Sequence, residues 1–407
     1  MQRHTFYLHV TAFAGGLVSL AVELAASSLL RPHFGTANLV WAAIIGLILL
    51  YLTAGYFLGG RWADRAPRAT TLYQIVAWAA FLVGLVPFVA RPVLAVAPRG
   101  FASLDAALLG GAFVAVLVLF SVPVTLLGCI SPFVIRLAMR DVESAGRTAG
   151  RVYAISTAGS FIGAFLPDLV LVPAIGTRNT FVTLSLALLL VALVGLARAA
   201  PRRLWAYLWM PLGILLLALL ARGRPVKAAP EAIYEGESAY NYIQVVEREG
   251  CRYLLLNEGE GVHSLYCPDQ TRVGGPWDYF LVAPFFNPPP YRPERVQSIA
   301  LIGLAAGTIA RQASAAYGPI PIDGAEIDPQ IVRVGRAYFA MDLPNLNAVA
   351  GDGRFFLAHS EWRYSLIGVD AYRLPYIPPH LTTVAVSYTH LRAHETPEHL
   401  VCRLLLE

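Results

Sequence analysis

The sequence is poor in charged residues and poor in cysteine. Charged residues make up only 14% of the 407 residues and 57% are hydrophobic, whereas a soluble globular chain carries about 25% charged residues. This shortage excludes an ordinary soluble protein and predicts that a large part of the chain lies in a lipid bilayer. The net charge of +5 does not predict nucleic-acid binding, because the arginines cluster at the ends of apolar segments, where they set membrane topology.

The four cysteines lack the spacing of a metal site, and we expect no bound metal. They are Cys129, Cys251, Cys267 and Cys402. Two interpretations of Cys251 and Cys267 remain open. They bridge a β-hairpin if that region faces an oxidising compartment, or they are two free thiols, which is the simpler expectation.

Seven apolar stretches of about 20 residues each are long enough to span a bilayer. Their limits are roughly 8–30, 38–59, 71–90, 106–135, 152–175, 179–197 and 204–221. The fourth contains Pro123 and Pro132, so we expect it to be kinked or broken. No cleavable signal peptide precedes the first stretch. The sequence therefore predicts a multi-pass transmembrane domain over residues 1–225.

Arginine residues predict the topology of this domain. Eleven of them fall on one side of the predicted bundle and four on the other. The richer side has Arg3, Arg61, Arg65, Arg68, Arg136, Arg140, Arg147, Arg151, Arg198, Arg202 and Arg203; the poorer side has Arg31, Arg91, Arg99 and Arg178. The positive-inside rule puts the N-terminus in the cytoplasm. Either one segment does not cross fully, or the C-terminal region is extracytoplasmic.

Two acidic residues, Glu23 and Asp168, are embedded in the apolar stretches. An uncompensated carboxylate costs a few kcal/mol in a bilayer, so such residues are candidates for binding or translocation. The alternative is that each pairs with backbone or a hydroxyl group and only fixes the register of the helices.

The pattern changes after residue 227. Apolar stretches around Tyr242 and Tyr253 flank a turn, which predicts a β-hairpin, and residues 226–290 are interpreted as a small β subdomain with a linker. From residue 291 to 383, strands at about 298–303, 320–326, 346–350 and 364–370 alternate with helices near 307–317 and 328–339. This alternation predicts a partial α/β domain with a parallel sheet.

Small and acidic residues follow these strands in an ordered set. A glycine turn, Gly303 to Gly307, follows the first strand, and Glu326, Asp352 and Asp370 end the next three. Small residues let backbone approach a ligand, and an acid at the end of the second strand suits ribose hydroxyls. Open α/β sheets bind ligands at the carboxyl ends of their strands. The sequence therefore predicts an adenosyl-nucleotide site here.

Five segments together resemble the spermidine synthase family of aminopropyltransferases. They are Ser238-Ala-Tyr-Asn-Tyr-Ile-Gln-Val245, Leu256-Asn-Glu-Gly259, Ile302-Gly-Leu-Ala-Ala-Gly-Thr308, Ala325-Glu-Ile-Asp328 and Gly351-Asp-Gly-Arg-Phe-Phe356. The resemblance implies a class I methyltransferase-like domain behind a small β subdomain. With the apolar segments in front, the chain is similar to a membrane-fused bacterial branch of that family.

The resemblance also implies roles for individual residues. Gly303 and Gly307 would line the nucleoside, Glu326 would bind its ribose, and Asp352 would hydrogen-bond the adenine amino group. Asp370 would sit beside the sulfonium and the attacking amine as orienting carboxylate and general base. The donor would be decarboxylated S-adenosylmethionine or S-adenosylmethionine, used as a co-substrate, with no cofactor tightly bound.

Three positions depart from the family pattern, and two of them concern the acceptor. The acid of the glycine loop is replaced by Ala306, the second acid of the last motif by Arg373, and the expected glutamine by Asn241. Asn241 is still expected at the donor, while Asp278 and Arg373 are expected in the acceptor pocket. An arginine there repels a polycation and favours a carboxylate or phosphate, so putrescine is doubtful as the acceptor.

The end of the sequence does not continue the sheet pattern. Residues 384–407 resemble the translated adapter sequence found at the ends of fragmentary reading frames, and we expect a non-native tail and an incomplete α/β domain. His390, His394 and His399 lie in this tail and are not interpreted as a zinc site.

Two hypotheses for the function follow. The first is a membrane-anchored transferase that moves an aminopropyl or related group from the nucleoside donor to an amine-type acceptor, with a homo-oligomer compatible with the sequence. The second is a transporter-like membrane protein with a non-catalytic nucleoside-binding domain. The segment from Gly59 to Arg65 either resembles the short cytoplasmic loop of major-facilitator transporters or is an ordinary basic loop after a helix that ends in glycine.

Overall fold

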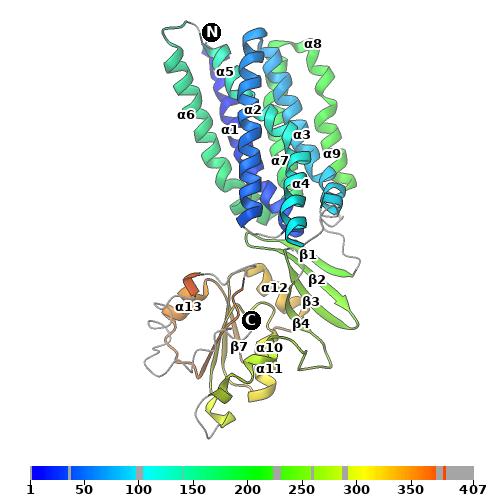
Figure 1. The fold of residues 1–407 in the computed structure, drawn as a ribbon, viewed down its shortest axis with the longest axis vertical. Coiled ribbons are helices and arrows are strands. Elements are labelled where there is room, and N and C mark those ends of the chain that lie inside the picture. The colour runs from blue at the N-terminus through cyan, green and yellow to red at the C-terminus, as the bar shows by residue number, and fades with distance from the viewer. Residues whose placement is uncertain are drawn as a thin grey trace. The chain divides into compact units, whose positions relative to one another are not determined.

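The computed structural model describes residues 2–34, 38–97, 104–139, 141–222, 231–257, 261–286, 292–372 and 379–381. The chain forms two compact units, Met1–Ala228 and Ala229–Glu407, and each is taken by itself below (Figure 1). The expected tail at 384–407 lies outside the described residues.

The first unit is a bundle of helices (Figure 1). The described helices are α1 (Gln2–Phe34), α2 (Asn38–Arg65), α3 (Ala69–Val96), α4 (Leu104–Gly128), α5 (Ile130–Ala138), α6 (Ala145–Leu166), α7 (Val172–Ala199), α8 (Pro201–Leu204) and α9 (Trp209–Leu220). Within the bundle α1 lies beside α6, α2 beside α4, and α3 beside α7. The amino-acid sequence favours helices here because the segments are apolar on most faces. In a helix the backbone polar groups pair within the same segment, so they need no partners from neighbouring segments.

Within the described residues, six helices are long and apolar enough to cross a membrane, by length and composition. One of them runs for 55 residues, Ala145–Ala199, which would be about 80 Å if straight. It is not straight, because Gly176 has a φ of +77° and non-helical backbone inside the run. The run therefore divides at Gly176 into two segments, where the sequence analysis expected the fifth and sixth stretches to part.

The predicted break in the fourth stretch is confirmed. Helix α4 ends at Gly128 and α5 begins at Ile130. Pro132 has no N–H and its ring crowds the carbonyl four residues earlier, which belongs to Gly128. Pro123 lies inside α4 and does not end it, so of the two prolines only Pro132 coincides with the break.

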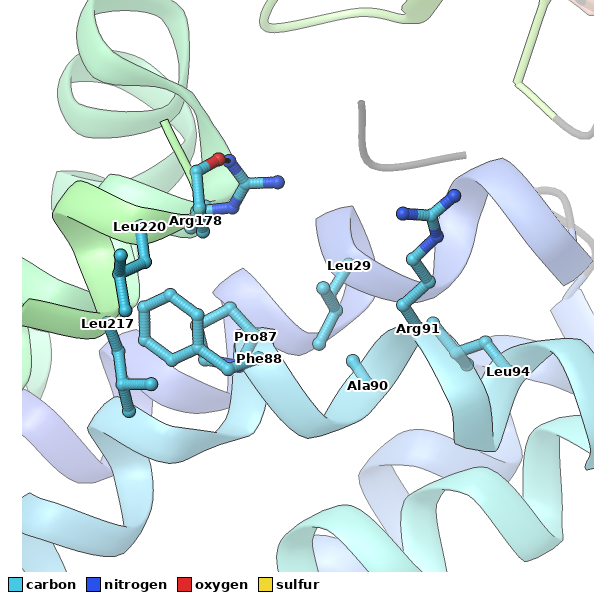
Figure 2. A pocket seen from close by; sticks show the side chains of 10 residues that line it. Leu29, Pro87, Phe88, Ala90, Arg91, Leu94, Arg178, Leu217 and Leu220 are labelled. Atoms are coloured by element: carbon cyan, nitrogen blue, oxygen red, sulfur yellow. Dashed lines mark hydrogen bonds between the residues drawn. The ribbon is translucent and has the colours of Figure 1, made fainter. Parts of the chain in front are cut away.

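Contacts within the bundle agree with the sorting of the arginines. On the arginine-rich side, Arg136 Nε lies 3.2 Å from the Asp64 carboxylate, and the Arg198 guanidinium lies 4.2 Å from the centre of the Tyr7 ring. At the other end, Arg91 and Arg178 line a pocket of about 350 Å³. Figure 2 shows both guanidinium groups on the same side of its apolar side chains, among them Phe88.

The second unit begins with an antiparallel sheet of β1 (Ala232–Glu237), β2 (Tyr242–Arg248), β3 (Cys251–Leu256) and β4 (Val262–Tyr266), in that order. The hairpin predicted from the sequence is β2–β3, with Glu249 and Gly250 at its turn. Both turn residues have positive φ, as the turns that match the twist of a hairpin require. Ile243, Val245 and Leu254 of this sheet pack with Ile331 and Phe339.

Cys251 and Cys267 are joined by a disulfide with an S–S distance of 2.04 Å. The simpler expectation of two free thiols was therefore wrong. Strand β3 pairs with β4 so that Arg252 lies opposite Tyr266, which brings the adjoining cysteines to a Cα–Cα distance of 4.4 Å. The pairing register decides this contact, and a spacing of 16 residues alone does not reveal it.

A parallel sheet follows, with strand order β7-β6-β5-β8. Its strands are β5 (Ile299–Ile302), β6 (Ile322–Glu326), β7 (Leu346–Ala350) and β8 (Leu366–Val369). The helices α10 (Trp277–Phe280), α11 (Thr308–Tyr317), α12 (Pro329–Tyr338) and α13 (Gly353–His359) accompany it. The four strands and the two longer helices lie where the alternation in the sequence predicted them. All three described pairings are parallel, so the carboxyl ends of the strands meet at one edge.

Gly303 is required where β5 meets β8. Its φ is +83°, and a Cβ at this position would lie 2.5 Å from the carbonyl oxygen of Asp370. The Asp370 amide donates to the Ile302 carbonyl at 2.7 Å, so this backbone cannot move aside without breaking the end of the sheet.

We expect Gly303→Ala to destabilise the second unit by about 2–4 kcal/mol, because it combines a positive φ with a backbone clash. The control is Gly351→Ala, where a Cβ meets nothing within 4 Å. Differential scanning calorimetry of the purified chain, with limited proteolysis of the second unit, measures the effect. Equal stability of the two variants would contradict the close approach.

Candidate functional site

A pocket of about 390 Å³ lies at the carboxyl ends of the parallel strands. This is within the size range of small-molecule sites. Five residues predicted from the sequence line it, namely Asn241, Gly303, Glu326, Asp352 and Asp370. They come from five separate segments of the chain, and the parallel pairing of β5 to β8 brings four of them to one edge.

Glu326 is the most deeply buried acid of the pocket, with 7% of its surface exposed. One carboxylate oxygen accepts a hydrogen bond from the Ala305 amide at 2.9 Å, and the other accepts from the Asp328 amide at 3.1 Å. Burial raises the pKa of the Glu326 carboxyl to about 7, and the backbone hydrogen bonds oppose this rise. The group therefore changes charge close to neutral pH.

The hydrogen bond from the Ala305 amide to Glu326 also shapes the glycine turn. Ala305 has a φ of +48° and lies between Gly303 and Gly307, which also have positive φ. Left-handed backbone is costly for alanine, and the bond to Glu326 holds it there. The end of β6 therefore fixes the loop that follows β5, and both line the pocket.

Asp352 lies at the start of α13. Its Oδ1 accepts from the Phe355 amide at 2.9 Å, which caps the helix, and its Oδ2 lies 3.3 Å from His380 Nε2. His380 also lines the pocket. A ligand that uses the Asp352 carboxylate would therefore meet an oxygen that already contacts the imidazole.

Asn241 is held by a buried hydrogen-bond network. Asp328 has no exposed surface, and its Oδ2 accepts from the Ser238 hydroxyl at 2.6 Å and the Asn241 amide at 3.0 Å. Asn257 donates to the Asn241 side-chain oxygen at 3.2 Å. Asp328 also caps α12 through the Gln330 amide. The network ties the antiparallel sheet to the parallel one beside the pocket.

Several residues near the pocket were not predicted as site residues. Tyr240, Asn257, His263, Tyr372 and His380 line it. Asp328 had a recognisable signal, because an aspartate followed by proline is typical of a helix start. Tyr240 and Asn257 lie inside segments that carry the family resemblance, which could have indicated them. The others carried no such signal, since only the fold brings their loops together.

Of the four remaining positions from the sequence analysis, the structure describes three, and none of these three lines the pocket. Gly307 is not among the lining residues; its φ of +83° ends the turn before α11. Asp278 is also not among them, and its carboxylate accepts from Gln312 at 2.5 Å and from the Gly274 amide at 3.2 Å. Ala306 is buried and its amide donates to Ser264. Arg373 lies outside the described residues. The roles expected of Gly307, Asp278 and Arg373 stay predictions.

The two acids of the helical unit differ in their surroundings. Asp168 lies in a π-helical segment, Pro167–Leu171, and accepts from the Ser28 hydroxyl at 3.4 Å. Glu23 is 8% exposed and lines a separate cavity of about 110 Å³ between helices.

Chemically, the pocket in the second unit gathers three carboxyl groups, two tyrosines and strained backbone around one space. Carboxylates accept hydrogen bonds from hydroxyl and amino groups and attract cations. The arrangement suits a ligand that has a polyhydroxyl part and a positively charged part.

No family model matches the chain. It is 34% identical over 166 residues to a probable polyamine aminopropyl transferase of Bifidobacterium longum strain NCC 2705, covering 40% of this chain and 35% of that protein. It is 30% identical over 160 residues to a polyamine aminopropyltransferase of Vibrio vulnificus strain CMCP6, covering 37% of this chain and 52% of that protein. The chain thus spans between a third and just over half of the length of these relatives.

Among solved structures, a probable spermidine synthase from Corynebacterium glutamicum ATCC 13032 is 16% identical and covers 39% of this chain and 58% of that one, with a TM-score of 0.32. The sequence relatives confirm the resemblance that the motifs indicated. Over the residues that it shares with them, the chain is similar to polyamine aminopropyltransferases.

Proposed function

We propose that this chain is a membrane-anchored transferase of the aminopropyltransferase type. Its donor is decarboxylated S-adenosylmethionine or S-adenosylmethionine, and its acceptor is an amine or a related nucleophile. The observation that carries the proposal is the convergence of Glu326, Asp352 and Asp370 with the Gly303 turn in one pocket. The similarity to two polyamine aminopropyltransferases supports it.

In the proposed complex Glu326 accepts hydrogen bonds from the ribose hydroxyls. Each carboxylate oxygen holds one backbone amide in the free pocket and keeps lone pairs for a further donor. Asp352 contacts the adenine, and Tyr240 and Tyr372 also line the pocket. Because the backbone bonds hold Glu326 in place before the ligand arrives, little order has to be gained on binding.

The chemical step needs a neutral amine next to a sulfonium. The amine nitrogen attacks the carbon bonded to sulfur, the C–N bond forms, and the C–S bond breaks with its electron pair remaining on sulfur. The sulfonium becomes a neutral thioether, and the proton of the attacking nitrogen passes to the Asp370 carboxylate. Asp370 also orients the cationic donor, since a carboxylate favours positive charge close by.

The acceptor remains a proposal from the sequence. Arg373 stands where the family has a second acid, and Ala306 where the loop has one. The Arg373 guanidinium repels a polycation and attracts an anionic group. We therefore favour an acceptor that carries an anionic group beside its amine.

The helical unit supports membrane anchoring. Large apolar side chains are exposed on it, including Leu50 at 60%, Phe57 at 68% and Leu212 at 66%. In water so many exposed apolar groups would drive association, whereas in a bilayer they face lipid. We therefore place the chain in the bacterial inner membrane as a multi-pass protein.

The test of the transferase proposal combines binding and turnover. We expect titration calorimetry of the purified chain in detergent to show binding of one of the two donors. We expect Asp370→Asn to keep that binding within about threefold and to lower transfer by 100-fold or more, as loss of a general base does. Mass spectrometry of the amine product measures transfer. Asp342→Asn, an exposed acid in the same unit, is the control.

The outcomes separate the two hypotheses. Absence of binding to either donor would refute the nucleoside site. Binding without transfer to any amine or amino acid would support the non-catalytic nucleoside-binding domain.

The ionisation of Glu326 predicts a pH dependence. The folded carboxyl has a pKa of about 7 against an ordinary value of 4.5, so the folded state keeps a proton that the unfolded state loses between these values. Stability therefore falls as pH rises through this window, by up to about 3 kcal/mol. The affinity for 5′-methylthioadenosine should instead rise with pH, because the ionised Glu326 carboxylate accepts hydrogen bonds from both ribose hydroxyls. We expect it to be about tenfold tighter at pH 8 than at pH 6, as the ionised fraction rises.

Glu326→Gln removes both dependences, since an amide does not titrate. Thermal unfolding and calorimetry from pH 5 to 8 measure them. A wild-type affinity that does not change with pH, or a variant that keeps the wild-type profile, would show that Glu326 does not contact the ligand.

The orientation of the second unit is a further prediction. With a cytoplasmic N-terminus and the 55-residue run counted as two crossings at Gly176, seven crossings place residue 231 onward outside the cytoplasm. The disulfide Cys251–Cys267 suits an oxidising compartment. We expect an alkaline phosphatase fusion after residue 225 to be active and a green fluorescent protein fusion there to be dark. The reverse pattern would mean that one segment does not cross.

A further inference from the structure

The cavity beside Glu23 in the helical unit has the character of a cation site. It measures about 110 Å³ and is lined by parts of α1, α2, α4, α5 and α6. Its polar lining includes Glu23, Ser19, Ser131, Ser156 and Ser160. One water takes about 30 Å³ in the liquid, so the cavity has room for about three waters, or for a small ion or a small ammonium group with part of that water.

Glu23 is the charged group that needs a partner. Its side chain is 8% exposed, and within the described part of the chain it makes no hydrogen bond or ion pair. A buried carboxylate without a partner costs several kcal/mol. Asp168, the other embedded acid, has Ser28 as a partner, so the difference is specific to this cavity.

Two hydroxyl groups of the cavity present acceptor oxygens to it. Ser19 spends its single hydroxyl hydrogen on the Gly15 carbonyl at 2.7 Å, and Ser160 spends its hydrogen on the Gly16 carbonyl at 3.0 Å. Each oxygen keeps lone pairs for another donor or a cation. The lining contains no lysine, arginine or histidine, so no positive charge of the protein competes for the site.

The break between α4 and α5 adds a carbonyl. Gly128 lines the cavity, and its carbonyl has no donor four residues on, because that residue is Pro132 and lacks an N–H. Broken helices inside membrane proteins use such carbonyls to hold cations. The break thus leaves a lining residue whose carbonyl lacks its usual helical donor.

The walls of the cavity are closely packed. A Cβ on Gly16 would lie 2.1 Å from the Ser156 carbonyl, and one on Gly159 would lie 2.1 Å from the Phe13 carbonyl. A Cβ on Gly55 would meet the Thr125 carbonyl at 2.3 Å. Backbones this close fix the positions of the oxygen atoms, which is what selective binding of a small ion requires.

We propose that this cavity binds one monovalent cation through oxygen atoms, with the Glu23 carboxylate as its counter-charge. The single acid balances one positive charge. A divalent ion is disfavoured, because the part of the chain that the structure describes contains no group of three or more acidic, histidine or cysteine side chains. Sodium ion and the ammonium group of a small alkylamine share this chemistry. The proposal does not depend on the transferase activity.

The experiment uses the purified full chain in detergent micelles, followed by tryptophan fluorescence during heating. Sodium, potassium and methylammonium chlorides are compared with choline chloride at equal ionic strength. A cation that binds should raise the unfolding temperature by about 2–4 °C at ten times its dissociation constant. We expect sodium or methylammonium to do so, and their order distinguishes an inorganic ion from an amine.

Variants assign the effect to the cavity. Glu23→Gln should abolish the cation-dependent shift, Ser160→Ala should weaken the affinity severalfold, and Asp168→Asn should leave the shift unchanged. A wild-type chain that responds to all salts as it does to choline would overturn the proposal, and so would a shift that survives Glu23→Gln. If Glu23→Gln does not fold, sodium-23 relaxation on the wild type and on Ser160→Ala decides, and equal binding by both would also refute the site.

Discussion

The hydrogen bond between the Ala305 amide and the Glu326 carboxylate, 2.9 Å long, is the interaction on which the pocket in the second unit depends. It joins the loop after β5 to the end of β6. The loop contains three residues with positive φ, Gly303, Ala305 and Gly307, and only the two glycines tolerate this backbone without strain. Without an acceptor at the end of β6, the Ala305 amide would have no hydrogen-bond partner, and the loop after β5 would not keep its conformation. The acid therefore builds the pocket before any ligand is present.

Burial gives this bond a second consequence. The same enclosure that makes Glu326 an effective anchor raises its pKa to about 7, so the anchor is charged only part of the time at neutral pH. Asp328, two residues later, has no exposed surface and accepts from Ser238, Asn241 and Gln330. One acid thus holds the turn while the other holds the antiparallel sheet against α12. Both follow from one short stretch at the end of β6.

Sequence reasoning found the parts of the site that are local. Strands and glycine turns have periodic signals, and an acid at the end of a strand is visible as soon as the strand is identified. It did not find His263 or His380, because their place in the pocket depends on how loops pack. It expected Gly307 in the lining of the pocket, whereas the side of Gly307 where a Cβ would stand faces the Met341 side chain. It favoured free thiols at Cys251 and Cys267, because a disulfide depends on a strand register that composition does not encode.

In the helical unit, sequence reasoning also did not distinguish the two embedded acids. Glu23 and Asp168 look alike in the sequence, since each is one acid in an apolar stretch. The fold gives Asp168 the Ser28 hydroxyl, and it gives Glu23 a cavity in which Ser19 and Ser160 have already donated their hydrogens to the Gly15 and Gly16 carbonyls. A hydroxyl that has donated can only accept, so these two serines present acceptor oxygens to the cavity rather than a hydrogen to the Glu23 carboxylate. A buried carboxylate without a hydrogen bond or an ion pair requires a proton or a cation, and this requirement distinguishes the two acids where hydrophobicity cannot.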